Sequence, residues 1–373
     1  LNEIEREIQE IDWEVSEAEK AGYDHFMYKE ILEQPEVIER TISGRLETTS
    51  EEIPIKLDQA SKYEKIWIVA CGTAYHAGLF GKDLFEKVLG VPVSVELASE
   101  FRYREPIVGK NDLGIVISQS GETMDTIAAT ELLKGNGAHV LALVNVVGSS
   151  LARMADSIFY LHVGPEIGVA STKAYLGMLV GQLLLAKHWD SANKLDVSFD
   201  EIAELPKLIE QTMACEKQIK DISEKIYKKN DIYFIGRGLD YALAAEGALK
   251  LKEISYLHAE ALAAGELKHG TLALIENGTP IIVTASQNHL LDKTTSNVQE
   301  VIARGAYVIA IGDNQSEKLE NISDEYVTLP DSNEILTTVI SIIPLQFIAY
   351  HVANLNGESI DQPRNLAKSV TVE

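Results

Sequence analysis

The chain has 373 residues, of which 46% are hydrophobic, and this is enough for two domains with buried cores. Asp and Glu number 57 against 33 Lys and Arg, and the net charge of −24 excludes a protein built to hold a DNA or RNA backbone. Only two cysteines are present, Cys71 and Cys215. They exclude a disulfide scaffold and a cysteine metal site, and they favour a reducing compartment, the cytoplasm.

Residues 1–30 predict an acidic, amphipathic leader with isoleucines at helical spacing: Ile4, Ile8 and Ile11. A helix is expected over residues 25–32, ahead of Pro35, docked on the first domain. The chain begins with Leu1 and shows no signal peptide, so we expect it to be a piece of a longer protein.

No apolar run approaches the ~20 residues that span a bilayer. The stretch Leu176–Ala186 is short and contains Gly177, Gly181 and Gln182, while Val339–Leu355 contains polar residues and a proline. Both stretches predict buried helices, and no membrane partner is expected.

Short apolar runs alternate with longer helical patterns through the first half of the chain. Most of these runs are too apolar to have one face in water, which is typical of a parallel sheet covered by helices on both faces. The expected strands are Ile66–Ala70, Val91–Val95, Leu113–Ile117, Val140–Val144 and Ile158–Leu161.

The same pattern recurs 166 residues later. Ile66–Val69 matches Ile232–Ile235, and the same offset takes Gly72 to Gly238 and Ser120 to Ser286. The period is far too long for a solenoid. It predicts two copies of one α/β domain, each a parallel, flavodoxin-like sheet, at residues 31–195 and 196–360, with a tail at 361–373.

The run Ser118–Thr123 directly follows an apolar strand and precedes a helix. In an open α/β sheet this is the turn where ligands bind. Its three hydroxyls, a glycine and the free N–H groups of a helix start can surround a phosphate, although capping of the helix is the alternative. The second copy reads Thr284–His289 here, without glycine and with fewer hydroxyls, so the two copies are expected to have diverged in function.

The predicted helix Leu243–Tyr256 is apolar nearly all round, and such helices are buried. Yet it carries Lys250 and Glu253 on one face with Glu246. These residues are either an ordinary helical charge pair or a general base tuned by a lysine, and the sequence leaves both open.

Other motifs give weaker signals. Gly236-Arg237-Gly238 follows a predicted strand, but Tyr241 stands where a dinucleotide-binding fold has its third glycine. NAD binding is therefore not expected. No histidine spacing fits a metal site, and neither a metal nor a cofactor is expected. By spacing alone, His269 is a solvent-facing histidine and Lys368 a mobile surface charge.

Five segments together resemble the isomerase half of the glutamine–fructose-6-phosphate aminotransferases, whose two copies are sugar isomerase (SIS) domains. The segments are Cys71–Thr73, Ser118–Thr123, Glu166–Lys173, Leu249–Glu260 and the tail Asp361–Glu373. The likeness spans residues 25–373. It implies that the N-terminal glutaminase domain of that family lies outside this chain, and that ammonia comes from it.

The resemblance implies fructose 6-phosphate as substrate, glucosamine 6-phosphate as product and glucose 6-phosphate as a further ligand. The phosphate would be held by Ser118, the backbone of Gln119, Ser120 and Thr123. The sugar would be lined by Thr73, Val169, Ser171 and Ala367.

It also implies four catalytic roles. Lys368 would form a Schiff base with the C2 carbonyl, which ammonia then displaces. Glu253, helped by Lys250, would carry the proton between C1 and C2. His269 would assist ring opening from the partner subunit of a homodimer.

One departure from the family is Ala74, where many members carry a serine that would add a donor to the phosphate. Two alternatives stay open: a non-catalytic SIS regulator that binds a phosphosugar, and another SIS-type isomerase or deglycase. The joint presence of Glu253, His269 and Lys368 favours the aminating enzyme, because a regulator needs only the phosphate loop.

Overall fold

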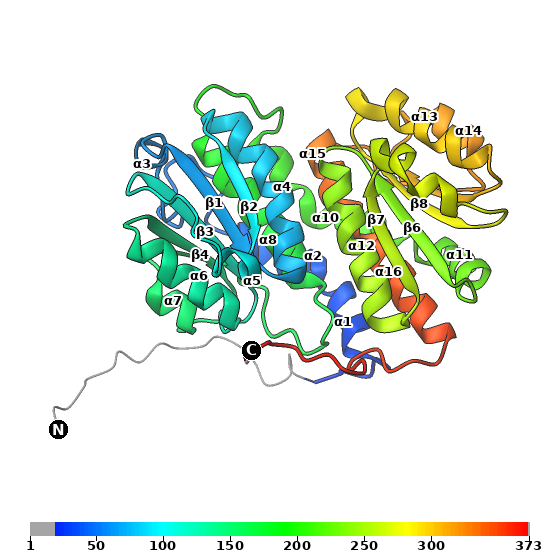
Figure 1. Ribbon diagram of the computed structural model, residues 1–373, viewed down its shortest axis with the longest axis horizontal. Helices are drawn as coiled ribbons and strands as arrows, with labels where there is room; N and C mark the ends of the chain where they lie inside the picture. The colour runs from blue at the N-terminus through cyan, green and yellow to red at the C-terminus, as the bar shows by residue number, and fades with distance from the viewer. Residues whose placement is uncertain (1–18, 372–373) are drawn as a thin grey trace.

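The computed structural model describes residues 19–371, and its first half is built on a five-stranded parallel sheet in the order β2-β1-β3-β4-β5 (Figure 1). The strands are β1 (Lys65–Ala70), β2 (Val93–Leu97), β3 (Asp112–Ser118), β4 (His139–Val144) and β5 (Ser157–Tyr160). The helices of this first half are α1 (Phe26–Leu32), α2 (Gln34–Ile42), α3 (Leu57–Ala60), α4 (Gly72–Leu89), α5 (Ala98–Phe101), α6 (Met124–Gly135), α7 (Ser150–Met154) and α8 (Lys173–Trp189).

The second half repeats this sheet in the order β10-β9-β8-β6-β7. Its strands are β6 (Asp231–Gly236), β7 (His258–Ala263), β8 (Pro280–Ala285), β9 (Tyr307–Gly312) and β10 (Glu325–Thr328). Its helices are α9 (Phe199–Ala203), α10 (Leu205–Met213), α11 (Glu216–Ile226), α12 (Leu239–Ser255), η2 (Ala264–His269), η3 (Thr271–Leu274), η4 (Asn288–Leu290), α13 (Leu291–Ile302), α14 (Glu317–Ile322), α15 (Glu334–Ile340) and α16 (Ile342–Leu355).

The predicted fold class is confirmed, since both sheets are parallel, flavodoxin-like in strand order and related by the internal repeat. The five expected strands exist with ends displaced by up to two residues. The second strand begins at Val93 and not at Val91, because Pro92 has no N–H and offers only its carbonyl, to the N–H of Ile66.

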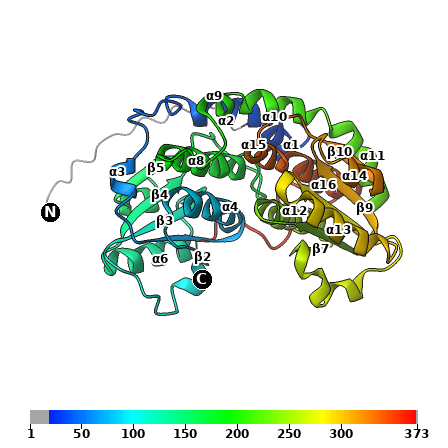
Figure 2. The ribbon, with the colours of Figure 1, turned by 90° about the horizontal axis from the view of Figure 1, so that it is seen from above.

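The two sheets face each other across a shared helical layer that contains α4, α8, α12 and α16 (Figure 2). Alternate strand residues separate the faces: Ile66 and Ile68 point into the shared core, while Trp67 and Val69 point into the outer core of the first sheet. The inner faces of both domains therefore belong to one continuous hydrophobic core, which fixes the two domains against each other.

The apolar stretches predicted as buried helices are α8 and α16, and both are buried along nearly their whole length. Within residues 19–371, the helical stretch Glu334–Leu355 is long and apolar enough to cross a membrane, yet its apolar window lies entirely inside the protein. Such a stretch is a core helix.

The N-terminal prediction is corrected in one respect. Ile4, Ile8 and Ile11 lie outside the described residues, but the helix expected over residues 25–32 is α1 and it contacts the second domain as well as the first. Tyr28 stacks on Tyr350 of α16, with ring centroids 4.9 Å apart, and its hydroxyl donates to Glu216 Oε1. It is α2, starting around Pro35, that packs on α8 of the first domain.

Gly236 allows α12 to begin close against the end of β6. A Cβ at this position would lie 2.5 Å from both the carbonyl carbon and the oxygen of Asp240 and 2.8 Å from the nitrogen of Tyr241. We expect Gly236→Ala to lower the free energy of unfolding by about 1–3 kcal/mol, because backbone atoms must move. Urea denaturation measures this, and Gly135→Ala, where nothing lies within 4 Å, should change stability little.

Candidate active site

A cavity of about 290 Å³ opens at the carboxyl ends of β1 and β3. The strand order reverses between these two strands, which is where open α/β sheets bind ligands. Four segments form its walls: the start of α4, the loop after β3, the loop before α8, and the C-terminal tail. Helix α12 of the second domain closes one side with Lys250 and Glu253.

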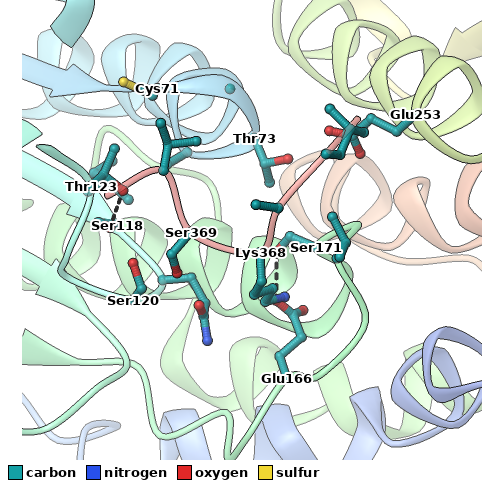
Figure 3. Close-up of a pocket in the computed structure, with 18 of the residues that line it drawn as sticks. Cys71, Thr73, Ser118, Ser120, Thr123, Glu166, Ser171, Glu253, Lys368 and Ser369 are labelled. Carbon is teal, nitrogen blue, oxygen red and sulfur yellow. Dashed lines mark hydrogen bonds and ion pairs between the residues drawn. The ribbon is translucent and has the colours of Figure 1, made fainter. Parts of the chain in front are cut away.

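The loop after β3 presents hydroxyl groups to this cavity. The hydroxyls of Ser118 and Thr123 lie 3.1 Å apart (Figure 3). Ser118 Oγ also accepts a hydrogen bond from the N–H of Gly121 at 3.0 Å. Ser120 Oγ accepts from the N–H of Glu122, so its own proton is free to donate. Thr123 is the N-cap of α6 but makes no capping hydrogen bond, which argues against capping as the purpose of the loop.

Gly121 is required by the shape of this loop. Its φ is +66°, and a Cβ would lie 2.1 Å from the hydroxyl oxygen of Ser149. The second copy has Gln287 at the matching position, so it cannot form the same turn without strain.

The C-terminal tail crosses from α16 of the second domain to the first domain (Figure 1). Its residues Leu366–Val370 line the cavity. Asp361 holds its start by accepting from the N–H groups of Phe26 and Met27, each at 3.0 Å. At the other end the carbonyl of Val370 accepts from the N–H of Met124, the first residue of α6. The tail is therefore tied to the N-termini of two helices.

Lys368 projects from the tail into the cavity. Its Nζ lies 2.5 Å from Glu166 Oε2 and 2.7 Å from the carbonyl oxygen of Gly168. Although burial alone would raise it, the pKa of Glu166 is held below its usual value by the Lys368 ammonium and by the N–H groups of Thr172 and Ala174. Glu166 is therefore an ionised partner that can hold the Lys368 ammonium in place.

A second buried acid, Glu30 of α1, lies behind this pair. Its Oε1 accepts from the N–H groups of Ile167 and Gly168 at 2.5 and 3.1 Å, while its Oε2 has no partner. Burial and the nearby Glu166 charge raise the pKa of Glu30 to about 7, against the opposing effect of Lys368. Glu30 could not be predicted as a site residue from the sequence, because only the fold brings α1 under the loop before α8.

Glu30 should make stability fall as pH rises. The folded chain binds its proton more tightly than the unfolded chain, so the stabilisation is complete below pH 4.5 and is lost as pH rises through about 7. A tenfold affinity difference is about 1.4 kcal/mol, so the loss is roughly 3 kcal/mol. Urea titrations of Glu30→Gln between pH 4.5 and 7.5 should show a flatter profile than the unmodified chain, and parallel profiles would contradict this assignment.

Helix α12 contributes a buried polar group that reaches into the first domain. Lys250 Nζ lies 2.6 Å from Glu253 Oε2, 3.3 Å from Glu246 Oε1, and donates to Thr73 Oγ1 of α4 at 3.0 Å. Burial would lower the pKa of Lys250, but the Glu246 and Glu253 carboxylates outweigh it and raise that pKa above its ordinary value. Lys250 is 1% exposed, so the pair is no ordinary surface charge pair.

The structure brings most of the predicted site residues to this one cavity. Those that line it are Thr73, Ser118, Gln119, Ser120, Thr123, Val169, Ser171, Lys250, Glu253, Ala367 and Lys368. Ala74, the departure from the family, lines it as well. His269 does not: it lies at the end of η2, exposed, outside the residues that line the cavity. The polar loop expected around it is a 3₁₀ helix.

Comparison with known proteins agrees with this geometry. The model of the SIS domain family matches residues 60–187 and 225–355, each of which contains one of the two sheets. The chain belongs to the SIS domain family.

Relatives named glutamine–fructose-6-phosphate aminotransferase [isomerizing] extend the match along the whole SIS pair. The protein of Clostridium tetani is 50% identical over 381 aligned residues, which cover 100% of this chain, and that of Thermococcus kodakarensis is 47% identical over 99% of it. The chain spans 63% and 62% of the lengths of these two relatives.

A solved structure gives the same result. The C-terminal domain of glucosamine-fructose-6-phosphate aminotransferase from Francisella tularensis superposes with a TM-score of 0.87 at 41% identity. The match covers 92% of this chain and 100% of that one. The resemblance seen in the sequence is thereby confirmed.

Proposed function

We propose that this SIS pair binds fructose 6-phosphate and converts it, with ammonia, to glucosamine 6-phosphate. One observation carries the proposal: Lys368 of the tail and Glu253 of α12 line the same cavity as the hydroxyl loop after β3 (Figure 3). A nucleophile, a base and an anion-binding loop are thus within reach of one small substrate.

The hydroxyl loop is the proposed phosphate site. Ser118, Ser120 and Thr123 supply hydroxyl donors, and the backbone N–H of Gln119 supplies another. The start of α6 adds the positive end of a helix dipole. With Ala74 of α4 in place of serine, the cavity lacks one donor beside this loop, so modestly weaker phosphate binding is expected than in members that carry the serine.

Lys368 is the proposed nucleophile. Once the ammonium has given up its proton to water, the neutral amine adds to the C2 carbonyl carbon, and loss of water leaves an imine. Ammonia then adds to the same carbon and the lysine amine leaves, so that nitrogen replaces the C2 oxygen and Lys368 is regenerated. Closure of the tail over the cavity protects the imine from water.

Glu253 is the proposed carrier of the proton. It would remove a proton from C1 and return it to C2, while the C1 hydroxyl proton passes to the imine nitrogen, so that the ketose imine becomes an aldose amine without a net change in protons. Lys250, ionised between Glu246 and Glu253, would position this carboxylate and balance its charge. Thr73, Val169, Ser171 and Ala367 would line the sugar.

The remaining roles depend on parts outside this cavity. We propose that His269 reaches the site of a second copy in a homodimer, where it would assist ring opening, since it is exposed on its own chain. Ammonia would come from the glutaminase domain that the sequence resemblance implies, and the cytoplasm is the proposed compartment.

The test is to incubate the purified chain with fructose 6-phosphate, with and without an ammonium salt, and to identify the products. Glucosamine 6-phosphate would support the complete proposal. Glucose 6-phosphate alone would support the isomerase step and refute amination by free ammonia. Tight binding with neither product would refute the enzyme and favour a phosphosugar-binding regulator.

A further inference from the structure

The second domain has its own version of the phosphate site, and it is filled. The internal repeat places Asp240, in the first turn of α12, at the position that Ala74 holds in α4. Ala74 leaves its place open and lines the cavity of the first domain. Asp240 instead extends a carboxylate that is 1% exposed.

This carboxylate is held by the loop after β8, which matches the hydroxyl loop after β3. The N–H of Ser286 lies 3.2 and 3.1 Å from its two oxygens, and the Ser286 hydroxyl donates to Oδ1 at 2.6 Å. Gln287 Nε2 adds a longer contact of 3.3 Å to Oδ2. Ser286 corresponds to Ser120, so the donor that would grip the substrate phosphate in the first domain grips an internal anion in the second.

The energetics indicate that the loop after β8 binds the Asp240 carboxylate as an anion, and that the contact is not incidental packing. A buried carboxylate is costly unless donors surround it, and buried donors are equally costly without an acceptor. Burial raises the pKa of Asp240 to about 6 although the hydrogen bonds from Ser286 and Gln287 oppose the rise, so it is ionised at neutral pH. The donors of the loop and the oxygens of the carboxylate therefore satisfy each other's hydrogen bonding, as a loop and a bound anion do.

We propose that Asp240 is an internal substitute for phosphate: it occupies the anion site of the second domain, so that only the first domain takes up a phosphorylated ligand. This proposal rests on the proposed function, in which the loop Ser118–Thr123 holds the substrate phosphate. It follows that a chain lacking this carboxylate acquires a second site for a tetrahedral oxyanion, bound by Ser286 and Gln287.

Equilibrium dialysis of inorganic phosphate against four forms of the chain tests this: the unmodified chain, Ser120→Ala, Asp240→Ala and the double variant. Asp240→Ala reproduces the alanine of the first domain. We expect one phosphate site in the unmodified chain and two in Asp240→Ala. The double variant should bind phosphate at least tenfold more tightly than Ser120→Ala alone. Equal binding in those last two would overturn the proposal, whereas binding by the unmodified chain that Ser120→Ala leaves unchanged would instead refute the proposed phosphate loop.

Asp240→Asn is the matched control, because the amide keeps the pocket filled. It should gain no phosphate site, and a gain equal to that of Asp240→Ala would overturn the proposal. If Asp240→Ala does not fold in a chloride buffer, its refolding is measured in a phosphate buffer of the same ionic strength. Recovery that is lost in Asp240→Ala/Ser286→Ala supports the proposal, and failure to recover, or recovery that persists without Ser286, overturns it.

Discussion

Lys368→Arg is expected to lower the rate of glucosamine 6-phosphate formation on the order of 10³-fold or more, because no covalent imine can form. Arginine keeps the positive charge and can still pair with Glu166 and the carbonyl of Gly168. Its guanidinium does not deprotonate in proteins, so it offers no amine lone pair. The tail should stay in place and the affinity for fructose 6-phosphate should change only a few-fold.

The readout that separates this role from a structural one is chemical trapping. Borohydride added with fructose 6-phosphate should reduce the imine and attach the sugar phosphate to Lys368 in the unmodified chain, as peptide mass analysis detects. Lys368→Arg should trap nothing. Undiminished turnover in this variant would remove Lys368 from the mechanism.

The sheets were predictable because most strands are short, largely apolar runs and the whole pattern occurs twice. Strand ends were less predictable: hydropathy alone does not show where pairing starts, as with Pro92 ahead of β2. The docking of α1 was only partly predicted, because the stacking partner of Tyr28 lies more than 300 residues away in α16.

The residues of the candidate site likewise divide into those that the sequence could predict and those that it could not. The hydroxyl loop could be predicted from its place after a strand, and Lys250 with Glu253 from charges on an apolar helix. Lys368 could not be predicted from spacing, because its significance depends on a tail that folds back to Glu166. Glu30 and Asp240 were missed for the same reason: each is an unremarkable acid in the sequence, and only burial against distant donors gives it meaning.

Glu253→Gln is the second change with a large expected effect. Glutamine has the shape of the carboxylate but cannot accept a proton from carbon, so turnover should fall by about 10²–10⁴-fold, the usual contribution of a general base. Binding of fructose 6-phosphate should persist, because the phosphate loop is untouched. Lys252→Gln, exposed on the same helix and absent from the cavity, is the control and should retain full activity.

The two active-site variants should fail at different steps. Glu253→Gln leaves Lys368 and Glu166 intact, so borohydride should still trap the sugar phosphate on Lys368 although no product forms. In D₂O, the unmodified chain should exchange the C1 hydrogen of fructose 6-phosphate, and Glu253→Gln should not. Exchange at an unchanged rate would show that another group carries the proton, while loss of trapping would show that Glu253 acts before the proton shift, in forming the imine.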